Sequence, residues 1–296
     1  MYLIVGCGLS GAVIAERLAS ESKQVLIIDK RNHVGGNCYD YVDLDTGIRL
    51  NKYGAHLFHT NNERVWRYVN RFSKWKRWEH SVLSYVDGQY VPVPVNITTV
   101  NKLCDENIQT EVEMKNWMSR NQHGFREITN SEEMALSLVG EELYEKMFKN
   151  YTFKQWGKYP AELDKSVLER IPVRDNFDGR YFTDKYQALP EDGYTRMFEN
   201  MLDNPNIEVR LGIDFFEFRK HNDMTKFKKI IYTGPIDTYF ADSGFEKLEY
   251  RSIDFNIVKE KRTGFYQPNS VVNYPSLDCL HTRVVEYKHF LNQKSP

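Results

Sequence analysis

The chain begins with short apolar runs that alternate with a helix-compatible stretch. Residues 2–5 form an apolar run that stops at glycine, and residues 9–19 follow with small side chains at helical spacing. A second apolar run covers residues 25–28 and ends in Asp29. This order predicts a strand, a tight turn, a helix and a second strand, which together begin a parallel sheet.

The period of the pattern then changes. In residues 63–72 the apolar positions lie on one face of a helix, whereas residues 81–96 alternate as extended segments around Asp87 and Gly88, a pair typical of a hairpin turn. Pro92 indicates an edge strand. We expect this hairpin to lie outside the unit that contains the parallel sheet.

The middle of the chain, residues 98–170, is predominantly helical in pattern. Asn130 with Glu133 three residues later predicts a helix cap, and Gly140 is expected to separate two helices. The basic, aromatic stretch 73–80 is interpreted as the solvated end of a helix with its tryptophans turned inward, and it is given no function.

The last third of the chain is mixed. A helix is expected near residues 196–203, and the buried run at residues 228–232 is expected to rejoin the parallel sheet. Alternating segments in residues 248–258 and 270–275 predict antiparallel strands.

These elements predict an α/β fold with three parts. A Rossmann-like parallel-sheet cofactor domain is expected from residues 1–80 and about 205–245, and a helical domain is inserted at residues 98–170. Residues 81–97, 171–204 and 246–296 are expected to form an antiparallel-sheet domain that binds substrate.

The turn after the first strand carries a dinucleotide signature. Gly6, Gly8 and Gly11 fit GxGxxG, in which the glycines permit the turn, a close approach to a pyrophosphate and close packing of the helix on the strand. Asp29 stands where a ribose hydroxyl needs an acceptor. The pair Gly35 and Gly36, followed by Asn37, resembles the second signature of flavoproteins and favours FAD over NAD.

Composition and charge narrow the class of protein. The formal net charge of −1 gives no general attraction for nucleic acid or an anionic membrane. The four widely spaced cysteines form neither a CxxC pair nor a zinc pattern, so no metal is expected and a reducing, cytoplasmic compartment is favoured. No apolar run approaches the length of a membrane span, and no secretory leader is recognised, so we expect a soluble protein.

Several unusual strings occur in one order along the chain. They are KRNHVGGN, KYGAHLFHTN, YTFKQWG, RIPVR, YTGPIDTYF and HTRVVEYKHF. Together they resemble the family of bacterial UDP-galactopyranose mutases, and the resemblance runs through the whole chain. It implies a flavin-dependent isomerase that interconverts UDP-galactopyranose and UDP-galactofuranose through a covalent adduct between the sugar's anomeric carbon and N5 of reduced FAD.

The resemblance and the glycine motifs also give the candidate residues. Cofactor binding is expected of Gly6, Gly8, Ser10, Gly11, Asp29, Lys30, Gly36, Asn37, His56, Leu57 and His59. Substrate binding is expected of Tyr151, Thr152, Trp156, Arg170, Tyr181, Asn273 and Arg283. The catalytic candidates are Arg170 and Arg283, which match the family's two diphosphate-binding arginines, and His56, which matches a flavin-adjacent position. Arg174 is left open between a surface ion pair and a site residue.

The resemblance further implies a homodimer, UDP-galactose as the small-molecule partner and a place in cell-surface polysaccharide biosynthesis. The family's chains continue beyond the equivalent of Pro296, and that segment carries part of the cofactor domain and tyrosines that hold the substrate phosphates. Two alternatives stay open: a truncated or non-catalytic member of the family, and a flavin oxidoreductase of the amine-oxidase type.

Overall fold

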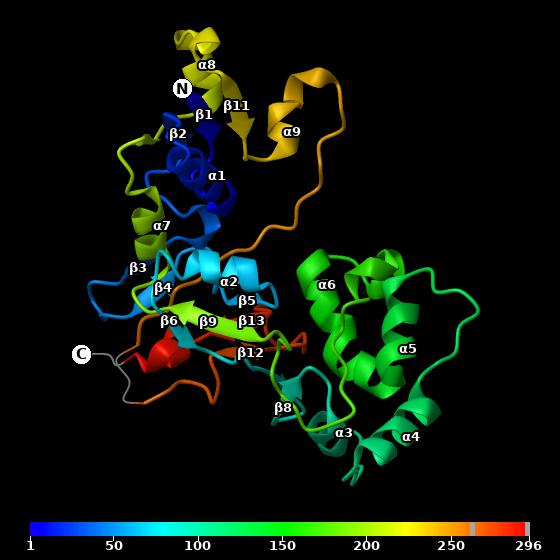
Figure 1. Ribbon diagram of the computed structural model, residues 1–296. Coiled ribbons are helices and arrows are strands. Elements are labelled where there is room, and N and C mark those ends of the chain that lie inside the picture. The colour runs from blue at the N-terminus through cyan, green and yellow to red at the C-terminus, as the bar shows by residue number, and fades with distance from the viewer. Residues whose placement is uncertain (261–263, 294–296) are drawn as a thin grey trace. The chain divides into compact units, whose positions relative to one another are not determined.

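The computed structural model describes residues 1–260 and 264–293 (Figure 1). Its described residues form two compact units, each built from two separate stretches of chain. The first unit comprises Met1–Trp78 and Lys185–Lys259, and the second comprises Glu79–Asp184 and Glu260–Gln293. The segments 185–204 and 246–259, which the sequence-based division assigns to the antiparallel-sheet domain, lie in the first unit.

A four-stranded parallel sheet forms the centre of the first unit, in the order β10-β2-β1-β11. Its strands are β1 (Tyr2–Val5), β2 (Val25–Asp29), β10 (Ile207–Leu211) and β11 (Lys229–Tyr232). All of β2 is buried, as expected for an apolar run inside a parallel sheet. The predicted return of the chain to this sheet at β11 is confirmed, because Tyr2 pairs with Lys229 in register. The expectation that this run is buried is wrong, because β11 is an edge strand and Ile230 is 40% exposed.

Helices pack on this sheet through small or aromatic side chains. Helix α1 (Leu9–Ser20) buries Ala12, Ala15 and Ala19. Helix α8 (Phe215–His221) contributes Phe215 and Phe218 to a cluster with apolar residues of β1 and β2. Further helical elements of the first unit are α7 (Tyr194–Leu202), α9 (Ile236–Tyr239), η5 (Met224–Lys226) and η6 (Ala241–Ser243).

Two small antiparallel sheets complete the first unit. One pairs β3 (Asp40–Val42) with β4 (Arg49–Asn51), and the other has the order β5-β9-β6, with strands Phe58–Thr60, Tyr186–Pro190 and Trp75–Arg77. They are accompanied by η1 (Gly36–Cys38) and α2 (Glu63–Val69), the latter capped by the Asn62 side chain. The expectation of a helix end in residues 73–80 is wrong, because this stretch contains β6, whose strand partner β9 lies far away in the sequence.

The second unit contains the predicted hairpin within a mixed sheet of order β13-β12-β7-β8. Its strands are β7 (Val82–Val86), β8 (Gln89–Val93), β12 (Val271–Asn273) and β13 (Arg283–Val285). The hairpin turn is confirmed at Asp87 and Gly88, which both have positive φ, as type I′ turns require. Pro92 lies on β8 at the sheet edge, as predicted.

Helices form the other part of the second unit. They are α3 (Ile97–Leu103), α4 (Glu111–Asn121), α5 (Ser131–Leu143), a π-helical turn η2 (Tyr144–Lys149), α6 (Asn150–Trp156), η3 (Pro160–Glu162), η4 (Lys165–Val167) and η7 (Tyr287–Asn292). Their core includes Met114, Trp117 and Leu143. The predicted Asn130 cap is confirmed, since its side chain accepts from the Glu133 amide. Gly140 breaks the helix at φ 75°, where a side chain would collide with the Asn121 carbonyl.

The antiparallel strands expected near the end of the chain are found only in part. The 270–275 segment contains β12, but residues 248–258 form neither helix nor strand. Ile253, Phe255 and Val258 in that segment are exposed. Their alternation therefore does not correspond to a strand with one buried face.

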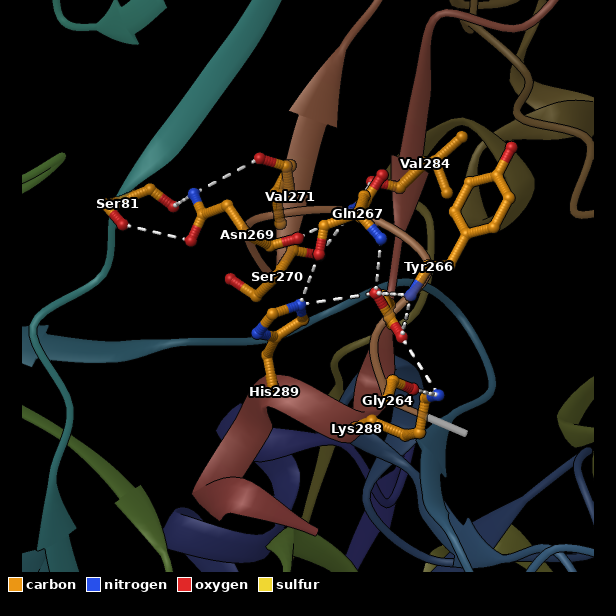
Figure 2. Close-up of polar contacts among 11 residues, drawn as sticks. Ser81, Gly264, Tyr266, Gln267, Asn269, Ser270, Val271, Val284, Lys288 and His289 are labelled. Carbon is orange, nitrogen blue, oxygen red and sulfur yellow. Dashed lines mark hydrogen bonds and ion pairs between the residues drawn. The ribbon is translucent and has the colours of Figure 1, made fainter. Parts of the chain in front are cut away.

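A buried carboxylate holds the β12–β13 pair at the end away from its loop. Glu286 accepts from the backbone amides of Tyr266 at 2.9 Å and Gln267 at 3.0 Å, and it pairs with Lys288 at 3.3 Å. The side-chain amide of Gln267 in turn donates from Nε2 to the Val284 carbonyl, as Figure 2 shows. These contacts tie the segment before β12 to β13, so that the two strands keep a fixed register.

Candidate functional site

The glycine turn of the first unit leaves a helix N-terminus open. Gly6 has φ 104°, and a side chain at Gly11 would stand 1.9 Å from the Gly6 carbonyl oxygen, so the turn and the helix are in direct contact. Gly8 is the N-cap of α1, and no side chain caps this end. The first amides of the helix, including that of exposed Ser10, are therefore available to an anion such as a pyrophosphate.

Asp29 fixes this turn to the end of β2. One carboxylate oxygen accepts from the backbone N–H of Cys7 at 2.7 Å, and the other accepts from that of Arg31 at 2.8 Å. A carboxylate has about four acceptor positions, so capacity remains for the hydroxyl groups of a ribose. Burial, with Asp29 nearby, raises the pKa of the Cys7 thiol to about 12, so that thiol stays neutral.

The second glycine pair packs against the first. The Gly35 amide donates to the Cys7 carbonyl at 2.9 Å, and a side chain at Gly36 would stand 2.8 Å from the Gly8 Cα. Space remains beside Gly8 itself, where a Cβ would meet nothing closer than 3.8 Å. Two glycine turns in contact, one open helix end and a carboxylate at the end of β2 fit the pyrophosphate and ribose of FAD. Exposed Lys30 flanks Asp29.

Other cofactor candidates also lie in the first unit. The Asn37 side chain accepts from Arg31 at 2.9 Å. His56 is half-buried, and its Nδ1 lies 2.8 Å from the Gly54 carbonyl oxygen, which fixes the orientation of the ring. Leu57 is half-buried beside it, whereas His59 on β5 is exposed. These positions are compatible with contacts to a flavin, and their roles stay predictions.

Three of the substrate candidates meet in the second unit. Arg283 Nη2 donates to the hydroxyl of Tyr151 at 2.6 Å, and that hydroxyl donates to Asn273 Oδ1 at 3.3 Å. Asn273 and Arg283 are also register partners in the β12–β13 pair. Within residues 1–260 and 264–293, no carboxylate forms an ion pair with Arg283, whose side chain is exposed. Its remaining donors can therefore bind an anion.

His80 is a neighbour of this cluster that the sequence analysis missed. Its side chain is 3% exposed, and its Nδ1 has no hydrogen-bond partner among the described residues. Burial, assisted by the positive charge of Arg283, lowers the pKa of His80 to about 4, so the ring is neutral near pH 7. Its ring lies edge-on to that of Tyr181, with centroids 5.8 Å apart. The surrounding basic, aromatic string carries no signal that separates this histidine from a surface one.

The remaining substrate candidates are more scattered. Thr152 is buried, whereas Trp156 at the end of α6 is 40% exposed. Arg170 is exposed on the segment after η4, and no ion pair joins it to any residue that the structure describes. Arg174 pairs with Asp178 at 2.9 Å, which favours an ion pair for this residue, but its side chain is only 11% exposed, so the pair is partly buried.

The candidates thus divide between the two units by expected role. All the cofactor candidates lie in the first unit, and all the substrate candidates lie in the second.

Among the described ranges, no group of three or more His, Cys, Asp or Glu side chains is placed to hold a metal ion. No helix in those ranges is long and apolar enough to cross a membrane.

Comparison with known proteins gives matches at both ends of the chain. A family model described as UDP-galactopyranose mutase matches residues 146–296, and one described as an NAD(P)-binding Rossmann-like domain matches residues 4–72. A crystal structure of reduced UDP-galactopyranose mutase matches with a TM-score of 0.68 and 15% identity, covering 98% of this chain and 70% of that one. At 15% identity, this structural similarity shows only that the two chains share a fold.

Two relatives are similar over almost the whole chain. A probable UDP-galactopyranose mutase of Klebsiella pneumoniae is 39% identical over 288 residues, which cover 97% of this chain and 73% of that protein. A dTDP-fucopyranose mutase of Escherichia coli is 40% identical over 290 residues, covering 97% of this chain and 76% of that protein. With the family model matching half of its length, the chain belongs to the UDP-galactopyranose mutase family.

Proposed function

We propose that this protein interconverts UDP-galactopyranose and UDP-galactofuranose and requires reduced FAD. The observation that carries the proposal is the hydrogen-bonded cluster of Arg283, Tyr151 and Asn273. Three side chains from separate segments of the chain converge there, and the exposed guanidinium of Arg283 has no carboxylate partner among the described residues. Such a group is suited to the diphosphate of a nucleotide sugar.

The cofactor would be held by the first unit. The open N-terminus of α1 would bind the pyrophosphate, and Asp29 would accept from the ribose hydroxyls. His56 and Leu57 are proposed to contact the ring system, together with His59. When bound in its reduced form, FAD would supply the nucleophile for the anomeric carbon of the sugar.

The second unit would hold the sugar nucleotide. Arg283 would bind the diphosphate with its free donors while the Tyr151 hydroxyl keeps the guanidinium oriented. Arg170, on an exposed segment, is proposed as the second diphosphate ligand. Neutral His80 and Tyr181 would line the same side of the cluster without adding charge. Thr152 and Trp156 on α6 are proposed to contact the nucleotide and the sugar.

A second nucleotide sugar is a specific alternative substrate. The relative named dTDP-fucopyranose mutase is as similar to this chain as the relative named probable UDP-galactopyranose mutase. Both names describe pyranose mutases, so the relatives support the class of reaction more strongly than the identity of the base and sugar. The assay below therefore compares both substrates.

The test begins with the purified chain. Its absorbance spectrum reveals bound flavin, and after reduction with dithionite the protein is incubated with UDP-galactofuranose or dTDP-fucofuranose and the products are separated by chromatography. We expect UDP-galactopyranose to form only with reduced flavin. Arg283→Ala should abolish turnover, and Arg126→Ala, which alters an exposed arginine of the second unit, should not.

Other outcomes would contradict the proposal. Bound flavin without a furanose-to-pyranose conversion of either nucleotide sugar would favour a non-catalytic member of the family. Bleaching of oxidised flavin by an amine substrate would favour an oxidoreductase. Turnover of dTDP-fucofuranose alone would keep the reaction class and change the substrate.

We further propose a cytoplasmic homodimer that serves cell-surface polysaccharide biosynthesis. The free thiols of Cys7, Cys38, Cys104 and Cys279 are compatible with a reducing compartment. Light scattering coupled to size-exclusion chromatography tests the oligomeric state.

A further inference from the structure

The loop between β12 and β13 closes around a single ammonium group. Lys154 Nζ donates to the carbonyl oxygens of Tyr274 at 2.5 Å and Ser276 at 2.7 Å. It also donates to the carbonyl of His281 at 2.9 Å, and that of Cys279 lies at 3.2 Å. An ammonium group has three protons, so these contacts occupy its donor capacity.

Lys154 differs from an ordinary surface lysine in its electrostatic environment. Burial lowers the pKa of its ammonium group, which raises the cost of keeping the charge. No carboxylate in residues 1–260 and 264–293 forms an ion pair with it. Backbone carbonyl dipoles compensate the charge instead, together with the Cys279 sulfur 3.8 Å away, and without the ammonium these carbonyls would lose the donor that they share. Within the loop, Tyr274 N–H also donates to the Thr282 carbonyl, and the Tyr274 and His281 rings are in contact. Lys154 adds to these contacts by joining four carbonyls of the loop to α6.

The same helix also holds the residues at the base of this loop. Tyr151 and Lys154 are three residues apart on α6 and therefore lie on one face. Tyr151 contacts Arg283 and Asn273, the paired residues from which the loop departs. At the opposite end of the strand pair, the Glu286 network fixes the backbone (Figure 2). The loop end is held by Tyr151 and Lys154 of α6 and by the pairing of Asn273 with Ser84 on β7.

We propose that Lys154 is a positioning residue for the nucleoside-diphosphate site. It holds the loop of residues 274–282 and thereby orients Arg283 on the edge strand β13, and it does not itself contact the phosphates because its protons are engaged by carbonyls. This inference rests on the proposed function, in which Arg283 binds the diphosphate.

The inference is tested by UDP binding in a double-mutant cycle. Lys154→Met should raise the Kd for UDP about tenfold, which corresponds to about 1.4 kcal/mol. In an Arg283→Ala background the same substitution should change the Kd little further, because it acts through Arg283. Lys158→Met, at an exposed lysine close to α6, is the matched control and should leave the Kd unchanged. Lys154→Arg keeps the charge and should recover part of the affinity.

Hydrogen exchange gives a second readout that does not depend on nucleotide binding. Amides in residues 274–282 should exchange at least about tenfold faster in Lys154→Met, while those of β7 and β8 keep their rates. Unchanged exchange in the loop would overturn the inference, as would a loss of affinity that persists in full in the Arg283→Ala background. If the unaltered protein does not bind UDP while the loop exchanges faster in the variant, the proposed function fails and the dependence of the loop on Lys154 stands.

Discussion

Gly8 and Gly11 belong to one glycine motif, but their surroundings predict different responses to alanine. At Gly8 the backbone lies at φ −80° and ψ −170°, which alanine adopts freely, and a Cβ would meet no atom within 3.8 Å. At Gly11 a Cβ would stand 1.9 Å from the Gly6 carbonyl oxygen and 3.0 Å from its carbon. The first substitution should therefore affect the ligand, and the second should affect the fold.

The expected change in the free energy of unfolding of each variant is the sum of a stabilising and a destabilising contribution. For Gly8→Ala, a poorer N-cap costs about 0.5–1 kcal/mol, and the reduced freedom of the unfolded chain returns about 0.4–1 kcal/mol, so stability should change little. The new methyl group, however, occupies the space beside the open helix end, and we expect FAD affinity to fall at least about tenfold. For Gly11→Ala, helix propensity gains about 1 kcal/mol, but the overlap forces α1 away from the turn, and overpacking of this kind costs about 1–3 kcal/mol or more.

The assay separates the two effects. Thermal unfolding is measured on flavin-free protein, and FAD affinity is measured by titration of flavin fluorescence. Gly8→Ala should melt with the unaltered protein and bind FAD weakly, whereas Gly11→Ala should melt several degrees lower. The reasoning is refuted if Gly8→Ala binds FAD normally, or if Gly11→Ala shows an unchanged melting temperature.

Two further predictions concern a ligand contact and an acid-sensitive carboxylate. Tyr151→Phe removes the hydroxyl that orients Arg283. The Kd for UDP, measured by calorimetry, should therefore rise about threefold to tenfold, without a comparable loss of stability. An unchanged Kd would contradict the role given to this hydroxyl. Burial acts to raise the pKa of Glu16, but hydrogen bonds from Tyr68 and Ser20, together with Arg71, outweigh it and leave the pKa below its ordinary value of 4.5. Because the pKa of Glu16 is lower in the folded state, this carboxylate stabilises the fold fully above pH 4.5. Its contribution is lost as the pH falls through the folded-state pKa. Melting temperatures measured from pH 6 to pH 3 should therefore fall less steeply for Glu16→Gln than for the unaltered protein. If melting temperature fell equally steeply with pH in the unaltered protein and in Glu16→Gln, the stabilising role of this carboxylate would be contradicted.

Much of the first unit could be predicted because its signals are local. The glycine turn, the small residues of α1 and the apolar runs of β1, β2 and β11 each specify an element within a few residues. Strand β6 could not be predicted in this way, because Trp75 becomes part of a strand by pairing with Pro190 on β9. The alternating residues 248–258 fail for the converse reason, since a strand pattern without a partner strand remains irregular.

The candidate site was predictable in its residue types and less so in its contacts. The resemblance singles out Tyr151, Asn273 and Arg283, but no sequence pattern reveals that one hydroxyl joins the other two. Lys154 was missed because its partners are backbone carbonyls, which any residue supplies. His80 was missed because burial, which only the fold determines, distinguishes it from a surface histidine.

The interleaving of the two units has a consequence for the order of folding during synthesis. Strand β1 pairs with β11, so its outer edge stays open until the ribosome has produced Lys229–Tyr232. The long segment Glu79–Asp184 emerges in between and can bury much of its own helical core beforehand. Closing so distant a pair of strands is slow and leaves an exposed strand edge in the interval. Nascent chains that stop before residue 229 should therefore be strong clients of chaperones, and yield should improve with slower synthesis.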